Sequence, residues 1–318
     1  MSLARIGRNL ILASIALVLV LPVHAEAGAP PSDHIRAGNA FAAHHQWDEA
    51  IAQYQQAIQE MPQSADAHYD LGNAWAAKGD LDNAIAEFQQ AEHLAPGDAE
   101  IHNNFGLALA RRGNFDEAIA QYRRAIYLKA GYAVAQYNLG NALMAEGKIS
   151  AAITEYYEAL VSKPGDVLTE NNLGNAMVGE GNVNDAIVEY RKAIHQQPQY
   201  AAAHFNLGNA LAREHRWNQA INEYRLTLLL KPEDEEAEEN MAYAFAKTGD
   251  LARASFEYRW AAHDHPGDAQ ARYNLGAVLE KQGRLQAALA QYRRAALLAG
   301  NNSKYRADYE RLAQVLRK

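Results

Sequence analysis

Cysteine is absent from all 318 residues of the chain. The protein therefore has no disulfide, no thiolate nucleophile, no cysteine ligand for a metal and no lipoprotein anchor. Motifs of catalysis are lacking as well: there is no glycine-rich phosphate loop, no nucleophile elbow and no His-Glu-x-x-His sequence. We therefore expect no enzyme activity, no cofactor, no metal site and no small-molecule substrate.

Positive charge is also in short supply. Lys and Arg number 30 against 38 Asp and Glu, which gives a formal net charge of −8. Nucleic acids and anionic membranes attract basic surfaces, so this balance argues against both as partners. We interpret the arginine pairs as solvated helix faces; they are Arg111-Arg112, Arg123-Arg124 and Arg293-Arg294.

The one pronounced apolar run lies at the N-terminus, from Leu10 to Leu21, after Arg5 and Arg8. A basic start, a short apolar stretch and small residues at the exit are typical of a secretory signal peptide. We predict a signal peptide over residues 1–25 and a linker over 26–30, with cleavage after Ala25 or Ala27. The mature protein would be periplasmic or secreted, and would meet the membrane only through this signal. An uncleaved anchor is the alternative, although 12 residues are few for a membrane span.

Glycines recur at multiples of 34 residues along the rest of the chain. A fixed period in this range indicates stacked repeats rather than one compact core. With the glycine numbered as position 8, the period divides residues 31–302 into eight units without an insertion, and Ala242 replaces the glycine of unit seven. The glycines are Gly38, Gly72, Gly106, Gly140, Gly174, Gly208 and Gly276.

Each unit has the features of a helix hairpin. Position 15 is usually Gly, which suits a chain reversal after a first helix, and position 32 is mostly Pro, which ends the second helix. Position 20 is always Ala, so small residues at 8 and 20 allow close approach of two antiparallel helices. One hairpin cannot bury its own apolar face and must stack on its neighbours. Position 24, always aromatic, fills the wider gap: Tyr54, Phe88, Tyr122, Tyr156, Tyr190, Tyr224, Tyr258 and Tyr292.

The ends of the helices can also be predicted. Asp98, Asp166 and Asp268 stand where a first helix needs an N-cap. Residues 303–318 follow the last unit as a polar helix that covers its exposed face. The apolar residues of this helix recur at helical spacing: Tyr305, Tyr309, Leu312 and Leu316.

This pattern resembles the tetratricopeptide repeat family over residues 31–302. The resemblance implies an all-α solenoid, a right-handed superhelix of eight 34-residue hairpins whose first helices line a concave groove. It also implies a role in holding a peptide or a partner protein. Position 4 departs from the tryptophan frequent in the family, since it reads His34, His68, His102, Gln136, Glu170, His204, Glu238 and Arg272.

Asparagine recurs at two positions of the first helices, although it is a poor helix former. Positions 6 and 9 lie three residues apart and therefore share one helix face. An amide offers both a donor and an acceptor, the complement of a peptide bond. We predict that position 6 binds an extended ligand backbone; at position 9 we favour the alternative that Asn bridges adjacent helices. Position 6 holds Asn104, Asn138, Asn172, Asn206, Asn240 and Asn274, and position 9 holds Asn39, Asn73, Asn141, Asn175 and Asn209.

The asparagine rows resemble the repeats of O-linked N-acetylglucosamine transferases, whose asparagine ladder holds substrate peptides. Only 16 residues follow the last unit, so we expect no glycosyltransferase domain and no such activity. The lysine-asparagine clamp that other members use for a C-terminal carboxylate is not matched, because position 5 is never Lys.

Unit seven differs most from the others. Tyr243 replaces Asn at position 9, and an acidic run over residues 233–239 enters its first helix. Acidic residues favour a helix N-terminus, which is a sufficient explanation. The sharper hypothesis is an acidic, aromatic pocket that selects a basic or apolar side chain.

Together these patterns predict an exported, non-enzymatic adaptor that binds a protein or peptide. One alternative is a structural scaffold that joins envelope or secretion subunits through its convex face or ends. Another is an accessory subunit of an enzyme.

Overall fold

The computed structural model describes residues 33–300 and 302–317; the predicted signal peptide and linker lie outside these residues. All regular secondary structure in the described part is α-helical, and none of its helices is long and apolar enough to cross a membrane. The helices are α2 (Asp33–Ala43), α3 (Trp47–Glu60), α4 (Ala65–Lys78), α5 (Leu81–Leu94), α6 (Ala99–Arg112), α7 (Phe115–Leu128), α8 (Ala133–Ala145), α9 (Ile149–Ser162), α10 (Val167–Glu180), α11 (Val183–Gln196), α12 (Ala201–Arg213), α13 (Trp217–Leu230), α14 (Glu235–Thr248), α15 (Leu251–Asp264), α16 (Ala269–Lys281), α17 (Leu285–Leu298) and α18 (Ser303–Val315).

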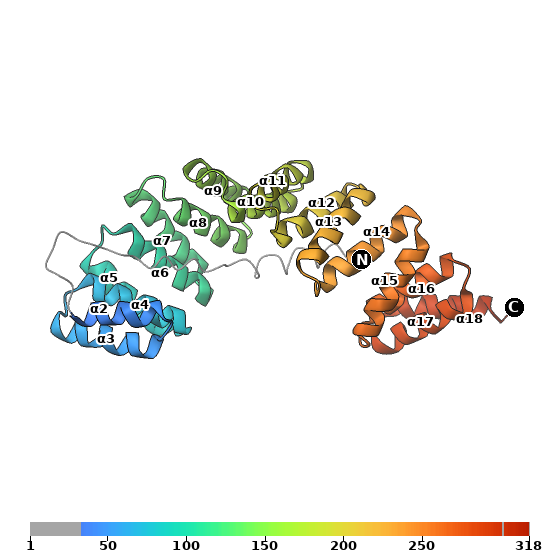
Figure 1. Ribbon diagram of the computed structural model, residues 1–318, viewed down its shortest axis with the longest axis horizontal. Helices are drawn as coiled ribbons and strands as arrows, with labels where there is room; N and C mark the ends of the chain where they lie inside the picture. Colours follow the sequence, from blue (N-terminus) through green and yellow to red (C-terminus); the bar gives the residue numbers. More distant parts are fainter. Residues whose placement is uncertain (1–32, 301, 318) are drawn as a thin grey trace. The chain divides into compact units, whose positions relative to one another are not determined.

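Contacts divide the chain into two compact units, one ending at Glu180 and one beginning at Gly181. Within each, every helix packs on its neighbours in sequence, as α2–α10 and α11–α18 show in Figure 1. First helices of consecutive repeats also touch: α4 with α6, α6 with α8, α8 with α10, and likewise α12 with α14 and α14 with α16. The expected all-α solenoid of stacked hairpins is confirmed within each compact unit.

The close approach of the two helices of a hairpin is confirmed at positions 8, 20 and 24. A Cβ added at Gly140 would lie 2.6 Å from Cε1 of Tyr156. Tyr156 and Ala152 are buried, so the ring rests directly on the glycine backbone. Every alanine at position 20 and every aromatic residue at position 24 is buried in the same way.

The turn after a first helix uses a left-handed residue. Gly79, Gly113 and Gly249 have φ angles of 93°, 95° and 85° at the C-caps of α4, α6 and α14. In units one and six the same position is His45 and His215, both with φ of 57°. A residue with a side chain pays an energetic cost in the left-handed conformation that glycine avoids. His45 and His215 adopt this conformation all the same, so the geometry of the hairpin imposes it.

The predicted caps of the first helices are confirmed. The carboxylate of Asp98 accepts hydrogen bonds from the backbone N–H groups of Glu100 and Ile101. Asp166 accepts from the N–H of Thr169, and Asp268 from the N–H of Gln270.

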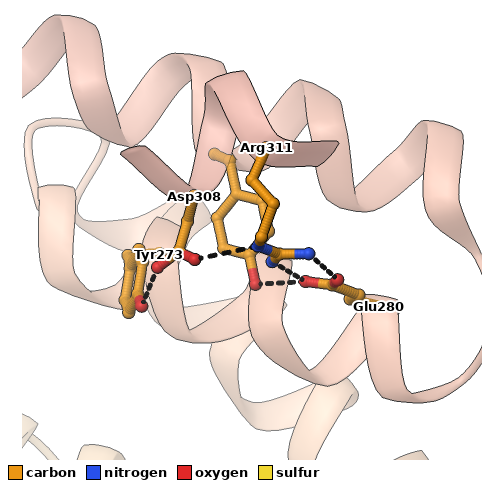
Figure 2. A network of polar contacts seen from close by, with 5 residues as sticks. Tyr273, Glu280, Asp308 and Arg311 are labelled. Carbon is orange, nitrogen blue, oxygen red and sulfur yellow. Dashed lines mark hydrogen bonds and ion pairs between the residues drawn. The ribbon is translucent and has the colours of Figure 1, made fainter. Parts of the chain in front are cut away.

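Helix α18 packs on α17 and is tied to α16 by a polar network (Figure 2). Tyr273 donates to Asp308 at 2.7 Å, and Arg311 forms two hydrogen bonds with the Glu280 carboxylate at 2.8 and 2.9 Å. Asp308 follows Tyr273 by 35 residues, the offset that joins a position 6 to position 5 of the unit before it. Helix α18 therefore stacks as the first helix of another repeat, whose second helix does not follow it within the described residues.

Candidate functional site

The asparagines of positions 6 and 9 bond to each other between consecutive first helices. The amide nitrogen of Asn104 donates to Oδ1 of Asn73 at 2.9 Å. The same bond joins Asn172 to Asn141 at 3.0 Å and Asn240 to Asn209 at 3.0 Å. Each bond spans 31 residues, from position 6 of one unit to position 9 of the unit before it.

Tyrosine hydroxyls extend these pairs into longer chains of hydrogen bonds. The second N–H of Asn172 donates to the hydroxyl of Tyr137 at 3.1 Å, and the Tyr156 hydroxyl donates to Asn141 at 2.7 Å. Oδ1 of Asn141 thus accepts two hydrogen bonds. One comes from Tyr156, on the second helix of the same hairpin, and the other from Asn172, on the first helix of the next hairpin. Equivalent bonds in other units are Asn104 to Tyr69 (2.8 Å), Tyr54 to Asn39 (2.6 Å) and Tyr224 to Asn209 (2.8 Å).

This pairing buries several of the predicted ligand-binding residues. Asn104, Asn172 and Asn206 are only 6%, 7% and 6% exposed, against the expectation that position 6 faces an open groove. The first helices touch, and the amide at position 6 lies in that contact. Asn104 and Asn172 use both N–H groups within the protein, so a ligand could reach only their oxygens without breaking a bond. Contact between these residues and a ligand stays a prediction.

Asn138 differs from the buried members of its row. The preceding unit has Leu107 at position 9 instead of Asn, so Asn138 donates one N–H to Oδ1 of Asn103 at 3.0 Å. Its second N–H and its oxygen bond to no other group in the described part of the chain. Asn138 is only partly buried. It therefore keeps a donor and an acceptor for another molecule.

Most of the remaining predicted residues lie on the first helices with intermediate exposure, whereas Asn73 is buried and Asn39 is exposed. Asn274 accepts a hydrogen bond from the side chain of Gln270 at 2.8 Å, and Asn175 and Asn240 are partly buried. The ring of Tyr243 packs edge-on against Trp217 at 5.9 Å between centroids.

In unit seven, where the sequence suggested an acidic, aromatic pocket, the aromatic rings already contact a lysine of the protein. The Lys247 ammonium lies 5.1 Å from the ring centroid of Tyr243 and 6.0 Å from that of Trp217. In the acidic run, burial and a hydrogen bond with Asp268 raise the pKa of Glu239 to about 8. Selection of a ligand side chain here stays a prediction.

Unit two carries an acid at position 6. Burial, with a smaller contribution from Asp66, raises the pKa of Asp70 to about 7. A protonated carboxyl has one donor and a carbonyl acceptor, as the amide of Asn does. Near neutral pH, Asp70 therefore exists partly in a form that resembles the asparagines of the later units.

A pocket opens beside Asn138 between α6, α8, α9 and α10, with about 80 Å³ of free space. Its lining includes Leu107, Val134, Tyr137 and Leu168. Sequence reasoning missed these residues. The signal that could have found the pocket is Leu107, which interrupts the run of asparagines at position 9.

The rim of the pocket carries an ion pair. Nζ of Lys163 lies 2.6 Å from Oδ1 of Asp166, and Thr169 donates to the same carboxylate from its backbone and its hydroxyl. Burial acts to raise the pKa of Asp166, but these hydrogen bonds lower it below the usual value. The carboxylate is thus ionised and already satisfied within the protein.

The histidines of position 4 join helices and do not converge on a metal. Nδ1 of His102 lies 2.6 Å from Oε1 of Gln121, and its Nε2 lies 3.1 Å from the carbonyl of Pro96 in the preceding unit. His68 and His204 make the equivalent contacts. Among the described residues, no group of three or more histidine or acidic side chains could hold a metal ion.

Comparison with known proteins identifies the family. A model described as "Tetratricopeptide repeat" matches residues 35–99, 103–167 and 239–303, and one described as "TPR repeat" matches residues 174–214. The first model alone covers more than half of the chain, which therefore belongs to the tetratricopeptide repeat family. No curated protein matches the sequence.

Solved structures share this fold. PilW, a widely conserved type IV pilus biogenesis factor, is 18% identical with a TM-score of 0.60, covering 64% of this chain and 95% of PilW. The Cut9–Hcn1 hetero-tetramer of the APC/C is 14% identical with a TM-score of 0.55, covering 88% and 55%. YrrB, a TPR protein with an unusual peptide-binding site, is 20% identical with a TM-score of 0.50, covering 58% and 95%. At these identities the likeness is one of fold.

Proposed function

We propose that this protein is an exported, non-enzymatic adaptor that binds an extended segment of a partner protein along its first helices. The observation that carries the proposal is the pocket beside Asn138, whose amide donates one N–H to Asn103 and keeps its second N–H and its oxygen available. A peptide group presents one N–H and one C=O, and Asn138 has an oxygen and an N–H to meet them. Recognition of this kind reads the backbone of the ligand.

The asparagine ladder then has two tasks. Asn104 and Asn172, whose N–H groups are used within the protein, hold neighbouring first helices in register. Asn138, with the partly buried Asn240 and Asn274 as further candidates, contacts the ligand. The division follows from hydrogen-bonding capacity, because a saturated amide gains little from a ligand.

The absence of cysteine provides a direct test of the working surface. Ala133→Cys, at the pocket, and Val161→Cys, on the second helix α9, each create a single site for a photoreactive label. Labelled Ala133→Cys should crosslink to a partner protein under native conditions, whereas labelled Val161→Cys should not. Crosslinks from position 161 alone, or from neither position, would contradict the proposal.

Replacement of the asparagines separates binding from stability. Asn138→Ala should weaken binding of the crosslinked partner about fivefold, the equivalent of one hydrogen bond of about 1 kcal/mol, and leave the melting temperature nearly unchanged. Asn104→Ala is the matched control at the same repeat position. It should lower the melting temperature, because it removes the hydrogen bonds that Asn104 makes with Asn73, Asn103 and Tyr69. The reverse pattern would show that Asn138 serves packing only.

A second candidate function has its own observation. Position 29 of the second helix is apolar and largely exposed in four of the eight units: Tyr127 (78%), Val161 (76%), Leu229 (75%) and Leu297 (73%). Exposed apolar groups on a recurring helix face favour contact with other proteins. A scaffold that joins subunits through its second helices would use this face, and the crosslink from position 161 is its test.

Export rests on the basic, apolar and small-residue sequence at the N-terminus, outside the described residues. We expect the mature protein in the periplasm or the medium to begin at Glu26 or Gly28. N-terminal sequencing of protein purified from its native cells decides this, and an intact Met1 would be the contrary result.

A further inference from the structure

The pocket beside Asn138 exists because one residue breaks the repeat pattern. Where units two, four, five and six have Asn at position 9, unit three has Leu107. An asparagine there would pair with Asn138, as Asn73 pairs with Asn104. Leucine cannot pair, so the amide of Asn138 stays available and the surface next to it becomes apolar.

The remaining walls keep the pocket apolar. Val134 and Leu168 come from the first turns of α8 and α10, and Tyr137 contributes its ring while its hydroxyl accepts from Asn172. The ion pair at the rim, Lys163 with Asp166, is already formed within the protein. A charged ligand side chain would lose its water here without gaining a dedicated partner.

The size of the pocket limits the occupant further. A cavity needs about 10–15 Å³ of such free space for one water, and a cavity of about 150 Å³ holds a benzene ring. The 80 Å³ beside Asn138 lies between these two values, so the pocket has room for a side chain of moderate size. It suits a branched aliphatic side chain.

We propose that this pocket takes the side chain of a valine, leucine or isoleucine of the bound peptide, while Asn138 holds the peptide group next to it. The inference rests on the proposed function and deepens it, since it adds side-chain selection at one place to backbone recognition. The other units with paired asparagines lack this combination.

A library of random linear peptides displayed on phage can test the inference with the purified full chain as target. Enriched peptides should share an aliphatic residue at one position. Its replacement by Ala in the synthetic, fluorescently labelled peptide should weaken binding to the wild-type chain at least tenfold, or about 1.4 kcal/mol, by fluorescence anisotropy.

Leu107→Asn is the informative variant, because it restores the residue of the neighbouring units and pairs with Asn138. It should weaken binding of the parent peptide at least tenfold, and the Ala peptide should then bind almost as well as the parent peptide, since the two changes remove the same contact. Val161→Asn, which replaces an exposed apolar residue on α9, should bind like the wild type. If Leu107→Asn melts well below the parent, Leu168→Ala replaces it in the same cycle.

The outcomes distinguish failure of the aliphatic pocket from failure of peptide binding as such. Peptides that bind but share a charged or aromatic residue, or lose nothing with Leu107→Asn, would overturn the aliphatic pocket and leave groove binding intact. Failure to enrich any peptide would contradict the proposed function itself.

Discussion

At the residue scale, the asparagines show how one residue at one repeat position can have different tasks. The sequence places positions 6 and 9 on the same helix face, which the structure bears out. It does not reveal their partners, because these lie 31 or 35 residues away in the preceding unit. Because Leu107 replaces the asparagine that would pair with Asn138, the second N–H and the oxygen of Asn138 stay available beside the pocket.

His204 illustrates a residue whose charge is set by its partners. Its Nδ1 lies 2.7 Å from Oε2 of Glu223, and its Nε2 lies 3.1 Å from the carbonyl of Pro198. Both partners accept hydrogen bonds, so both contacts are complete only when the imidazole carries two protons. The hydrogen bond that the imidazole donates to the Glu223 carboxylate, above all, raises the pKa of His204.

A pH-dependent stability follows for this pair. A raised pKa in the folded state stabilises the fold fully below the unfolded value near 6.5, and this contribution is lost as pH rises through the folded value. His204→Gln should therefore lower stability by on the order of 1–2 kcal/mol at pH values below about 6.5, and by less near pH 9. Denaturant unfolding of both chains across this range measures the gap. A gap that widens with pH would contradict the charged imidazole.

At the scale of the hairpin, glycine at position 8 and the aromatic at position 24 act as one unit. The ring of Tyr156 lies against the backbone of Gly140 and its hydroxyl bonds Asn141 on the same helix. Two helices are thus joined by packing and by a hydrogen bond through a single side chain. This explains why position 24 is tyrosine in most units.

Gly140→Ala tests this packing against helix propensity. Alanine favours the helix by about 1 kcal/mol, but its methyl group would meet the buried Tyr156 ring and cost about 1–3 kcal/mol. We expect a net loss of stability in thermal unfolding. Gly179→Ala is the matched control in α10: its Cβ meets only the flexible end of Ile149, at 3.3 Å, and should stabilise. Equal effects of both changes would refute the ring contact. Unit seven has Ala242 at position 8, which shows that the fold can adapt to a methyl group at this position.

Most of the hairpin could be predicted from the sequence, since the residues at 8, 15, 20, 24 and 32 each have one physical task. The turns of units one and six could not be predicted from His45 and His215, because a histidine does not by itself specify a left-handed conformation. The pocket could not be predicted either, because the residues that line it come from four different helices, α6, α8, α9 and α10. Local chemistry sets each element, whereas contacts between elements set the site.

At the scale of the whole molecule, stability depends on neighbours. Within each compact unit, helices contact those next to them in sequence, and first helices add contacts to the next first helix. Helix α18 ends the series with Tyr305 and Leu312 buried, and with Tyr273 and Tyr305 stacked at 4.4 Å between ring centroids. Arg311 fixes it to Glu280 and lowers the pKa of that carboxyl.

Truncation tests this dependence on neighbours. Removal of residues 269–318 takes away the last hairpin and α18. The helices that remain and lose contacts are α15 and α14, which both contact α16. The shortened chain should keep the far-ultraviolet circular dichroism of its remaining helices and unfold cooperatively, because each repeat is stabilised by those beside it. It should associate or precipitate more readily, since α15 then exposes the surface around Ala261 and Ala262 that packs on Ala271. Arg311→Ala in the full chain is the milder control, which should lower the melting temperature without causing association. Loss of all helical signal in the truncated chain would mean that the array folds as one indivisible block, and the neighbour rule would be wrong.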